Sequence, residues 1–447
     1  MPRLSVAITH ARMTTDEIVR LNREYTFFSW SAQARVRPIV IDRAEGIYFW
    51  DTDGKRYIDF NSQLMSVNIG HGDRRVADAI ADQAHRLAFA APQFATEVRG
   101  RLGELLAELT PGDLKTFFFT LGGAEANENA LRMARMVTGR QKVLARFRSY
   151  HGATAGAISV TGDPRRWASE PAVPGVVHVL DPWRLGRDAP EPVEEHLAYL
   201  EEVIQYEGPN TIAAFILETV TGTNGILIPP DGYLQGVREL CTKYGILMIA
   251  DEVMAGFGRT GRWFAVDHWD VVPDLLTMAK GLTSSYLPLG AVAMSRHVAD
   301  FFAERVYYGG LTYSAHPMSC AAAIAAIGVL RDDDLIGNAA RLDPLLRSLL
   351  AELKDRHPSV GAVRSIGLFG IVELIRNRLT REPMAPFNGT SPEMAALDAR
   401  LREAGLFTMT HWNAFFTNPP LCITEEQLRE AFAIIDRALE MTDSAVE

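Results

Sequence analysis

A single lysine, Lys280, is set in a segment that is otherwise apolar or small. The segment reads DLLTMAKGLTSSYLPLGA and covers residues 274–291. Burial disfavours the charged ammonium, so it lowers the pKa of a lysine and makes the amine a nucleophile or a Schiff-base former near neutral pH. A lysine at a strand end, with its ammonium reaching water, is the structural alternative. The remaining lysines lie in a turn, at strand starts or near helix ends: Lys55, Lys115, Lys142, Lys243 and Lys354.

Asp251 and Glu252 follow an apolar run, residues 246–250, that predicts a buried strand. In open α/β sheets, ligands bind at the carboxyl ends of the strands. A carboxylate at this position can meet a cationic nitrogen of a ligand. A helix cap, or an ion pair with Arg259 or Arg262, would be the structural explanation.

Two glycines, Gly122 and Gly123, stand with Ala124 between a predicted strand and a predicted helix in FFFTLGGAEANENALRMAR. The free backbone N–H groups of a helix start bind anions, and glycines let a phosphate approach closely. The pattern is neither a Walker loop nor GxGxxG. A phosphate site and a plain tight turn both fit these residues.

Two further predicted strands end in side chains that could contact a ligand. Tyr150 and His151 follow one strand, where an aromatic ring can stack on a flat ligand or pack in the core, and Glu218 ends another. Together with Lys280 and Asp251, the set supplies an amine, an acid, an anion site and a stacking ring. Pyridoxal 5'-phosphate needs these groups for its aldehyde, its pyridinium nitrogen, its phosphate and its ring.

The elements that must position these residues alternate between helical patterns and short apolar runs from about residue 70 to 330. Runs such as KVLARF, IAAFILE, ILMIAD and LLTMA do not alternate with polar residues, which is typical of parallel strands covered on both faces. We therefore predict an α/β fold with a large domain at 66–330. Residues 1–65 and 331–447 are predicted to form a smaller α+β domain from both chain ends.

The overall composition is that of a globular protein, with 47% hydrophobic residues and 22% charged residues. The formal net charge of −10 argues against nucleic acid or an anionic membrane as a partner. The longest small-apolar run, residues 320–330, is too short to span a bilayer. Three isolated cysteines and a charged N-terminal segment without an apolar core lead us to expect a cytoplasmic protein.

The order of these motifs resembles the class III (ω-amino acid type) aminotransferases, which have the fold type I of pyridoxal-phosphate enzymes. The resemblance covers nearly the whole chain, through GIYFWDTDGKRYIDF, NIGHGDRRVADAI, GGAEANENA, YHG, DEVMAGFGRTG, AKGLTSSYLPLGA, LTYSAHPMSCAAA and NPPLCITEEQL. It implies a large domain with a mostly parallel sheet, a small α+β domain and bound pyridoxal 5'-phosphate. It also implies a homodimer or tetramer with active sites shared between subunits.

The resemblance implies a role for each matching residue. Lys280 would form the imine with the cofactor and shuttle a proton, and Asp251 would bond the pyridinium nitrogen. Tyr150 would stack on one face of the ring and Val253 would pack on the other. The resemblance implies four further sets of cofactor contacts. They are the phosphate turn (Gly122, Gly123 and Ala124), the histidine beside Tyr150 (His151), a glutamate that often pairs with a mobile arginine (Glu218), and a threonine that reaches over from the neighbouring subunit (Thr312).

Departures from the family pattern bear on the substrate. Gly122 replaces a common serine, Met254 replaces a common glutamine, and Met409 stands where amine:pyruvate transaminases carry a carboxylate-binding arginine. Arg35 or Arg43 could replace that arginine, whereas Arg259 is expected to be structural. The predicted substrate pocket consists of Trp30, Met65, Tyr150, Met409, His411 and Trp412. A protonated His411 is expected to assist the binding of an acidic distal group.

The resemblance therefore implies a ping-pong transamination. A primary amine or an ω-amino acid such as β-alanine or taurine would give its nitrogen to pyruvate or 2-oxoglutarate. A glutamate-1-semialdehyde-type aminomutase and a dialkylglycine-type decarboxylase share the fold and are the alternatives. A binding protein on a retained fold is a third alternative, which the intact Lys280 and Asp251 disfavour.

Overall fold

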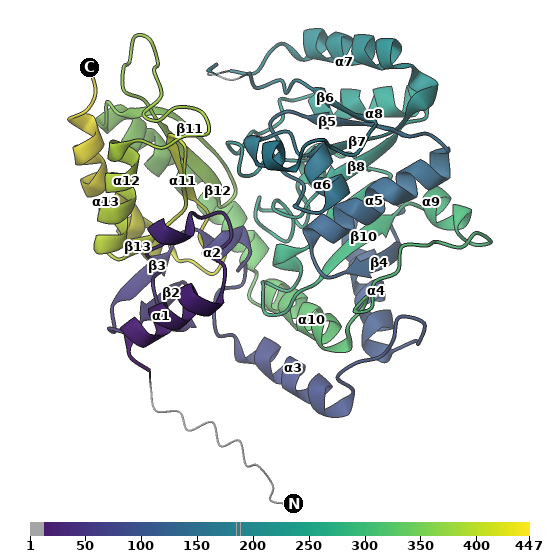
Figure 1. Cartoon of the computed structure of the whole chain (residues 1–447), viewed down its shortest axis with the longest axis horizontal. Coiled ribbons are helices and arrows are strands. Elements are labelled where there is room, and N and C mark those ends of the chain that lie inside the picture. The colour runs from purple at the N-terminus through teal and green to yellow at the C-terminus, as the bar shows by residue number, and fades with distance from the viewer. Residues whose placement is uncertain (1–12, 185, 188) are drawn as a thin grey trace, which may run out of the picture.

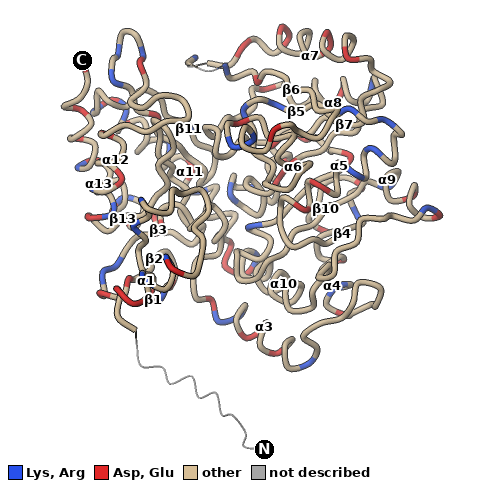
Figure 2. Tube along the Cα trace, in the orientation of Figure 1, with Lys and Arg blue, Asp and Glu red and all other residues tan. Residues whose placement is uncertain are grey.

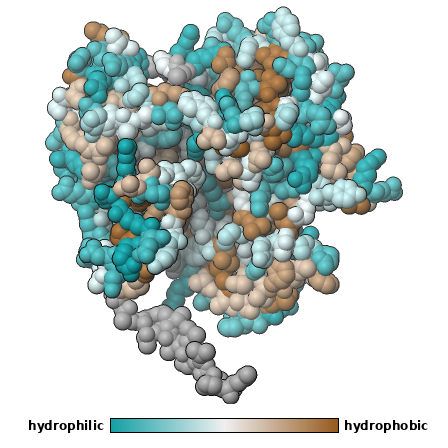
Figure 3. Space-filling model, viewed as in Figure 1, coloured by the Kyte–Doolittle hydropathy of each residue, from teal (hydrophilic) through white to brown (hydrophobic). Residues whose placement is uncertain are grey.

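The computed structural model describes residues 13–184, 186–187 and 189–447. The chain forms two lobes, a larger one around a seven-stranded sheet and a smaller one that holds both ends of the described chain (Figure 1). Hydrophilic residues cover most of the face in Figure 3, which is hollowed between the two lobes. Positive and negative residues are interspersed over both lobes (Figure 2).

The seven-stranded sheet has the order β4–β10–β9–β8–β7–β5–β6. β10 runs antiparallel to both of its neighbours, and the other adjacent strands are parallel. Every residue of β7 to β10 is buried, as the unbroken apolar runs predict. The strands are β4 (Thr116–Thr120), β5 (Lys142–Arg146), β6 (Val176–Val179), β7 (Ile212–Glu218), β8 (Leu247–Asp251), β9 (Leu275–Met278) and β10 (Gly290–Met294).

The register of the parallel strands aligns their carboxyl ends. Glu218 of β7 lies opposite Asp251 of β8, and Asp251 lies opposite Thr277 of β9. Side chains that are far apart in the sequence therefore meet at one edge of the sheet. The helices of this lobe are α3 (Arg74–Arg86), α4 (Glu97–Leu109), α5 (Gly123–Thr138), α6 (Ala155–Val160), α7 (Val193–Glu207), α8 (Tyr233–Tyr244), α9 (Arg296–Phe301) and α10 (Pro317–Asp332).

The smaller lobe joins segments from both ends of the described chain. In one sheet, β13 (Leu406–Phe407) pairs in parallel with β3 (Arg56–Asp59), next to β2 (Tyr48–Asp51) and β1 (Ile41–Glu45). The second sheet has the order β11 (Val360–Ile366), β12 (Phe369–Leu374), β15 (Ala414–Thr417) and β14 (Thr410–His411). The helices are α1 (Thr15–Tyr25), α2 (Ser62–Met65), α11 (Leu335–Arg356), α12 (Pro392–Glu403) and α13 (Glu425–Asp443).

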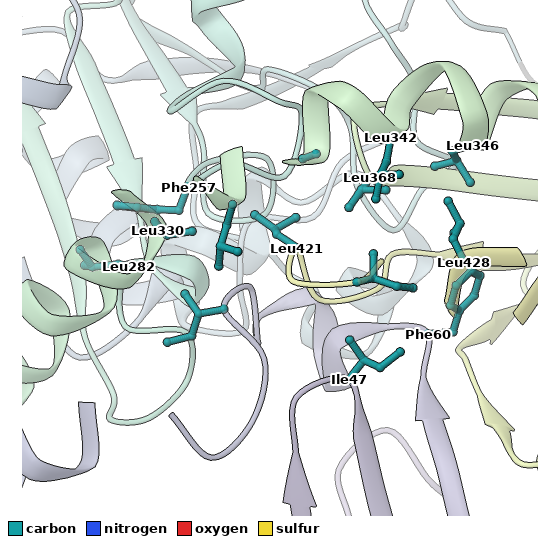
Figure 4. Packing of buried hydrophobic residues seen from close by; sticks show 14 of the residues in the cluster. Ile47, Phe60, Phe257, Leu282, Leu330, Leu342, Leu346, Leu368, Leu421 and Leu428 are labelled. Atoms are coloured by element: carbon teal, nitrogen blue, oxygen red, sulfur yellow. The ribbon is translucent and has the colours of Figure 1, made fainter. Parts of the chain in front are cut away.

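One hydrophobic cluster connects the two lobes. Figure 4 shows Phe257, Leu282 and Leu330 near one end of this cluster and Leu342 and Leu368 toward its other end. Ile47 and Phe60, from the N-terminal part of the chain, and Leu428, from the C-terminal part, belong to the same cluster. The buried Arg259 guanidinium also donates to the carbonyls of Leu368 and Pro419 and to the hydroxyl of Ser62. The predicted domain boundaries, at the end of α2 and inside the last turn of α10, stay a prediction.

No helix in the described part of the chain is long and apolar enough to cross a membrane.

Candidate active site

A cavity of about 480 Å³ opens at the carboxyl ends of the central strands. All of the predicted cofactor-contacting residues except Thr312 line it: Gly122, Gly123, Ala124, Tyr150, His151, Glu218, Asp251, Val253 and Lys280. Thr312 lies exposed before α10 and outside this cavity. The structure thus brings the predicted amine, acid, glycine turn and aromatic ring together in one place.

Lys280 is placed in the cavity by the short turn that follows β9. Burial lowers the pKa of its ammonium to about 8, while the nearby carboxylates of Glu218 and Asp251 act in the opposite direction. Its backbone has a φ of +42°, a conformation that L residues other than glycine rarely adopt. Backbone strain of this kind persists where the surrounding structure enforces it, often at functional sites. Lys280 is thus held as an amine that loses its proton more easily than an exposed lysine.

A hydrogen-bond network holds the Asp251 carboxylate at the end of β8. One carboxylate oxygen, Oδ2, lies 2.8 Å from Nδ1 of His151 and accepts a hydrogen bond of 2.7 Å from the Asn127 amide. The other oxygen accepts from the backbone N–H of Val253 at 3.0 Å. The hydroxyl of Thr277 donates to the Asn127 carbonyl oxygen at 2.7 Å and so orients this amide.

The N-terminus of α5 forms the anion-binding side of the cavity. Gly122 has no side chain to cap the helix, and the first helical backbone bond is Ala126 N–H to Gly122 C=O. The amides of the first turn are therefore available to an anion. A Cβ on Gly123 would lie 2.7 Å from a methyl of Val253, so only glycine allows this approach of helix and strand end.

Glu218 differs from the expectation based on the family resemblance. Its carboxylate accepts from the backbone N–H groups of Tyr150, at 3.0 Å, and of Gly222, at 2.8 Å, instead of from a mobile arginine. Burial raises the pKa of this carboxyl. Glu218 therefore fixes the loop that carries Tyr150.

Sequence reasoning missed Arg165, the arginine that packs on Tyr150. The centre of its guanidinium lies 3.6 Å from the centre of the Tyr150 ring. It is paired with Asp163 and donates to the hydroxyl of Thr223 at 2.8 Å. Asn127 and Thr277 were also missed. Asn127 had a weak signal, since it lies one helical turn after Gly123.

The predicted substrate-pocket residues do not all lie together. Trp30 is 65% exposed in the segment after α1, and Met65 is buried in an apolar cluster against which Met409 packs. His411 and Trp412 stack at 4.2 Å and line a second cavity, of about 270 Å³. Tyr150 lines the first cavity, and Thr223 lines both.

The residues expected to bind the acid group of a substrate either lie outside the active-site cavity or are uncharged. Arg43 lies on β1, and its guanidinium is 3.7 Å from the ring centre of Trp50. Arg35 lies in a short turn near the N-terminus. Neither lines the cavity. Burial lowers the pKa of His411 to about 4, so a protonated His411 is not available at neutral pH.

Comparison with known proteins shows the family. Residues 30–439 match the aminotransferase class-III family, and the chain belongs to it. It is 34% identical to a putrescine–pyruvate aminotransferase of Pseudomonas aeruginosa over 422 residues, which cover 91% of each protein.

Solved structures of the family have the same fold. A taurine:2-oxoglutarate aminotransferase from Bifidobacterium kashiwanohense, in complex with PLP and glutamate, is 43% identical, with a TM-score of 0.93 over 97% of this chain and 99% of that one. An (S)-enantioselective ω-transaminase from Thermomicrobium roseum is 38% identical, with a TM-score of 0.89 over the same shares.

The protein is therefore a pyridoxal-phosphate-dependent aminotransferase of the ω type with the fold type I architecture, as the motifs predict. The cavity fits this cofactor on its own chemistry. It offers a partly buried amine, a carboxylate in a hydrogen-bond network and an uncapped helix start, within a space of about 480 Å³.

Proposed function

We propose that the protein transfers the amino group of a primary amine or an ω-amino acid of the β-alanine or taurine type to pyruvate or 2-oxoglutarate. The observation that carries this proposal is the apolar wall around Lys280, which includes Leu64, Met254 and Leu289. Among the described residues that line this cavity there is no arginine. The amine-bearing carbon of an ω-amine carries no acid group, so it fits such an apolar wall without a guanidinium beside it.

We assign the cofactor contacts from the same geometry. The cofactor, when bound, supplies an electron sink for the substrate carbon. Lys280 holds and moves the proton at that carbon, and Asp251 keeps a proton on the ring nitrogen of the cofactor. The α5 amides bind the phosphate, Tyr150 and Val253 enclose the ring, and His151 orients Asp251.

The test is a donor and acceptor panel on the purified protein with added pyridoxal 5'-phosphate. Putrescine, β-alanine, taurine and n-propylamine are offered with pyruvate or 2-oxoglutarate, and the new amino acid is measured. Turnover of α-amino acids alone as donors, or release of carbon dioxide from the donor, would contradict the proposal. Turnover without any 2-oxo acid would favour an aminomutase.

We also propose that the active unit is a homodimer in which Thr312 reaches the phosphate of the partner subunit. The support on this chain is a group of exposed aromatic residues: Tyr308 and Tyr313 lie close to Thr312 in the sequence, and Phe89 packs on Tyr313. The rings of Phe89 and Tyr313 pack at 6.0 Å. Exposed aromatic patches of this kind mark protein interfaces, and a second copy of the chain is the occupant that a shared active site requires.

Light scattering tests the assembly. The wild type should have twice the 49.4 kDa mass of the chain. Tyr313→Arg should yield monomers that lose the cofactor on dialysis, because a charge is placed in the proposed interface. Tyr206→Arg on α7 is the matched control, since Tyr206 is also highly exposed but lies far from Thr312 in the sequence. A wild-type monomer that turns over would refute the shared site.

A further inference from the structure

We propose that the second cavity is a binding site, separate from the catalytic cavity, for a small organic anion that carries a carboxylate on a flat apolar body. The cavity has a volume of about 270 Å³ and lies between the two lobes, because residues of both lobes line it. The large lobe contributes Arg148 and Trp183, and the small lobe contributes Arg364, Phe387 and Trp412. Of the described residues, only Thr223 also lines the cavity of Lys280. Such a site is additional to transamination and is independent of the identity of the amino donor.

Two guanidinium groups converge on the turn at residues 224–225, at one wall of this cavity. Nη2 of Arg148 donates to the carbonyl of Asn224 at 2.6 Å. Nε and Nη2 of Arg364 donate to the carbonyl of Gly225 at 3.0 and 2.8 Å. A Cβ on Gly225 would lie 2.7 Å from Nη2 of Arg148 and 3.4 Å from Nη2 of Arg364, so both cations stand over the same glycine. Like charges this close repel each other, and an anion beside both of them offsets the repulsion.

The carboxylate in the cavity wall balances only one of these two charges. Arg364 is paired with Glu373, the single carboxylate among the described residues that line the cavity. Arg148 forms no ion pair within the described chain, and its guanidinium donates to the backbone carbonyls of Trp183 and Asn224. Burial lowers the pKa of Arg148, and the charge of Arg364 acts in the same direction, whereas the Glu373 carboxylate opposes them. A partly buried cation without a carboxylate partner is stabilised by an anionic ligand.

The rest of the cavity lining is flat and apolar. The ring of Trp412 stacks on that of His411, with 4.2 Å between the ring centres, and packs on the ring of Phe387 at 4.5 Å. Burial lowers the pKa of His411 to about 4, so its ring is uncharged at neutral pH. Ile371 and Pro383 add aliphatic surface to the same lining. Small-molecule pockets combine such an apolar lining with a few polar groups that fix the orientation of the ligand.

An aromatic carboxylate matches both parts of the cavity. A guanidinium binds a carboxylate through two parallel N–H bonds, and an aromatic ring packs on other rings in an offset or tilted arrangement. An inorganic anion would leave the rings unused, and an uncharged ring would leave Arg148 without a counter-ion. The volume of about 270 Å³ admits a single substituted ring of the size of benzoate.

Calorimetry on the holoenzyme with benzoate and with benzamide, its uncharged analogue, tests the charge of the ligand. Benzoate should bind in a saturable way and about 10-fold more tightly than benzamide, the value of a hydrogen bond to a charged group. In Arg148→Gln, the affinity for benzoate should fall about 10-fold while that for benzamide stays the same. Arg238→Gln is the matched control, because Arg238 is a partly buried arginine that pairs with Asp274 and lines a different cavity. Absence of saturable benzoate binding, or equal affinities for benzoate and benzamide, would overturn the anion site.

Phe387→Ala tests the flat part of the cavity and also decides the case if Arg148→Gln does not fold. Phe387 is 47% exposed, so its truncation leaves the core intact. The variant should bind benzoate about three- to tenfold more weakly, the value of one aromatic contact. Inorganic phosphate can use the arginines but not the rings, so it should bind the wild type more weakly than benzoate does. Tighter binding of phosphate than of benzoate, or an unchanged benzoate affinity in Phe387→Ala, would refute the aromatic class of ligand.

The last experiment places the ligand relative to Lys280. Aminooxyacetate reacts with the bound cofactor and fills the catalytic cavity. Benzoate titrated into the holoenzyme after this treatment should keep its affinity within about threefold, since the two cavities share only one described residue of their walls, Thr223. Loss of benzoate binding after the treatment would put benzoate in the catalytic cavity and refute a second site.

Discussion

His151 and Asp251 lie on different strand ends, yet Nδ1 of the imidazole is 2.8 Å from Oδ2 of the carboxylate. Both residues are buried, at 2% and 4% exposure. The loop after β5 and the end of β8 are thereby locked together, and the acid at the bottom of the cavity has a single orientation.

Asp251→Asn should retain the cofactor but lose most of its activity. The neutral amide cannot hold a proton on the ring nitrogen, so the electron sink is weakened. We expect kcat to fall by roughly 10²-fold or more, the size of a lost charge-stabilising group. Absorbance of the bound cofactor checks retention, and steady-state kinetics check the loss. Near-normal turnover would remove Asp251 from the catalytic set.

Asn127→Ala should impair the same function indirectly. The change removes the hydrogen bonds of Asn127 to Asp251 and to the backbone carbonyl of His151. We expect kcat to fall about 10-fold, because an orientation and not the acid itself is lost. Asn129→Ala is the control on the same helix, since Asn129 contacts Glu125 and Tyr307 and does not line the cavity. A comparable loss in both variants would point to damage of α5 instead.

Lys280→Ala should abolish turnover, because the residue that holds the cofactor and moves the proton is missing. Loss of a positioned acid–base group alone typically lowers rates 10²–10⁴-fold. Borohydride reduction of the wild-type holoenzyme followed by peptide mapping should place the cofactor on Lys280. A label on another lysine would show that Lys280 has been assigned wrongly.

Lys280→Met should stabilise the cofactor-free protein, and the gain should shrink at high pH. The pKa of Lys280 is lowered by burial from 10.5 to about 8. Below pH 8 the folded chain therefore carries a partly buried charge, which destabilises it by about 1–3 kcal/mol after screening by water in the cavity. Between about pH 8 and 10.5 the unfolded chain binds more protons than the folded one, so wild-type stability rises with pH.

Denaturant unfolding of the cofactor-free wild type and of Lys280→Met at pH 7 and pH 10 measures this difference directly. Lys354→Met, a change near the end of α11, is a control that should show no such pH-dependent gain. An equal difference in the free energy of unfolding at both pH values would mean that Lys280 is not buried as a charge.

His411→Ala should affect charged and uncharged donors alike. Burial lowers the pKa of His411 to about 4, so the imidazole is already neutral from pH 6 to pH 8 and cannot attract an acid group. This replaces the expectation that a protonated His411 reads the distal charge. Profiles of kcat/KM against pH for taurine and n-propylamine, in wild type and variant, provide the measurement. A taurine-specific loss below pH 7 in the variant would restore the earlier hypothesis.

The sequence, through its residue patterns and the family resemblance, predicted the fold class and nine of the residues that line the cavity on this chain. Lys280 and Asp251 each stand directly after an apolar run that forms a strand of the sheet, and Tyr150 follows the strand β5 after three residues. Parallel strands place their carboxyl ends at one edge, so side chains after several such strands must meet. The anion site at Gly123 could also be predicted from the sequence, because a strand that is followed at once by a helix leaves free amides at the helix start.

Only the tertiary structure showed which side chains contact and support these residues. Arg165 follows no strand, and its contact with Tyr150 depends on how the loop after α6 folds back over the sheet edge. Met65, expected in the pocket, lies in an apolar cluster that contains residues of both lobes, so its orientation depends on how the lobes pack. Local residue patterns encode strand ends and turns, whereas contacts between separate segments depend on the packing of the whole chain.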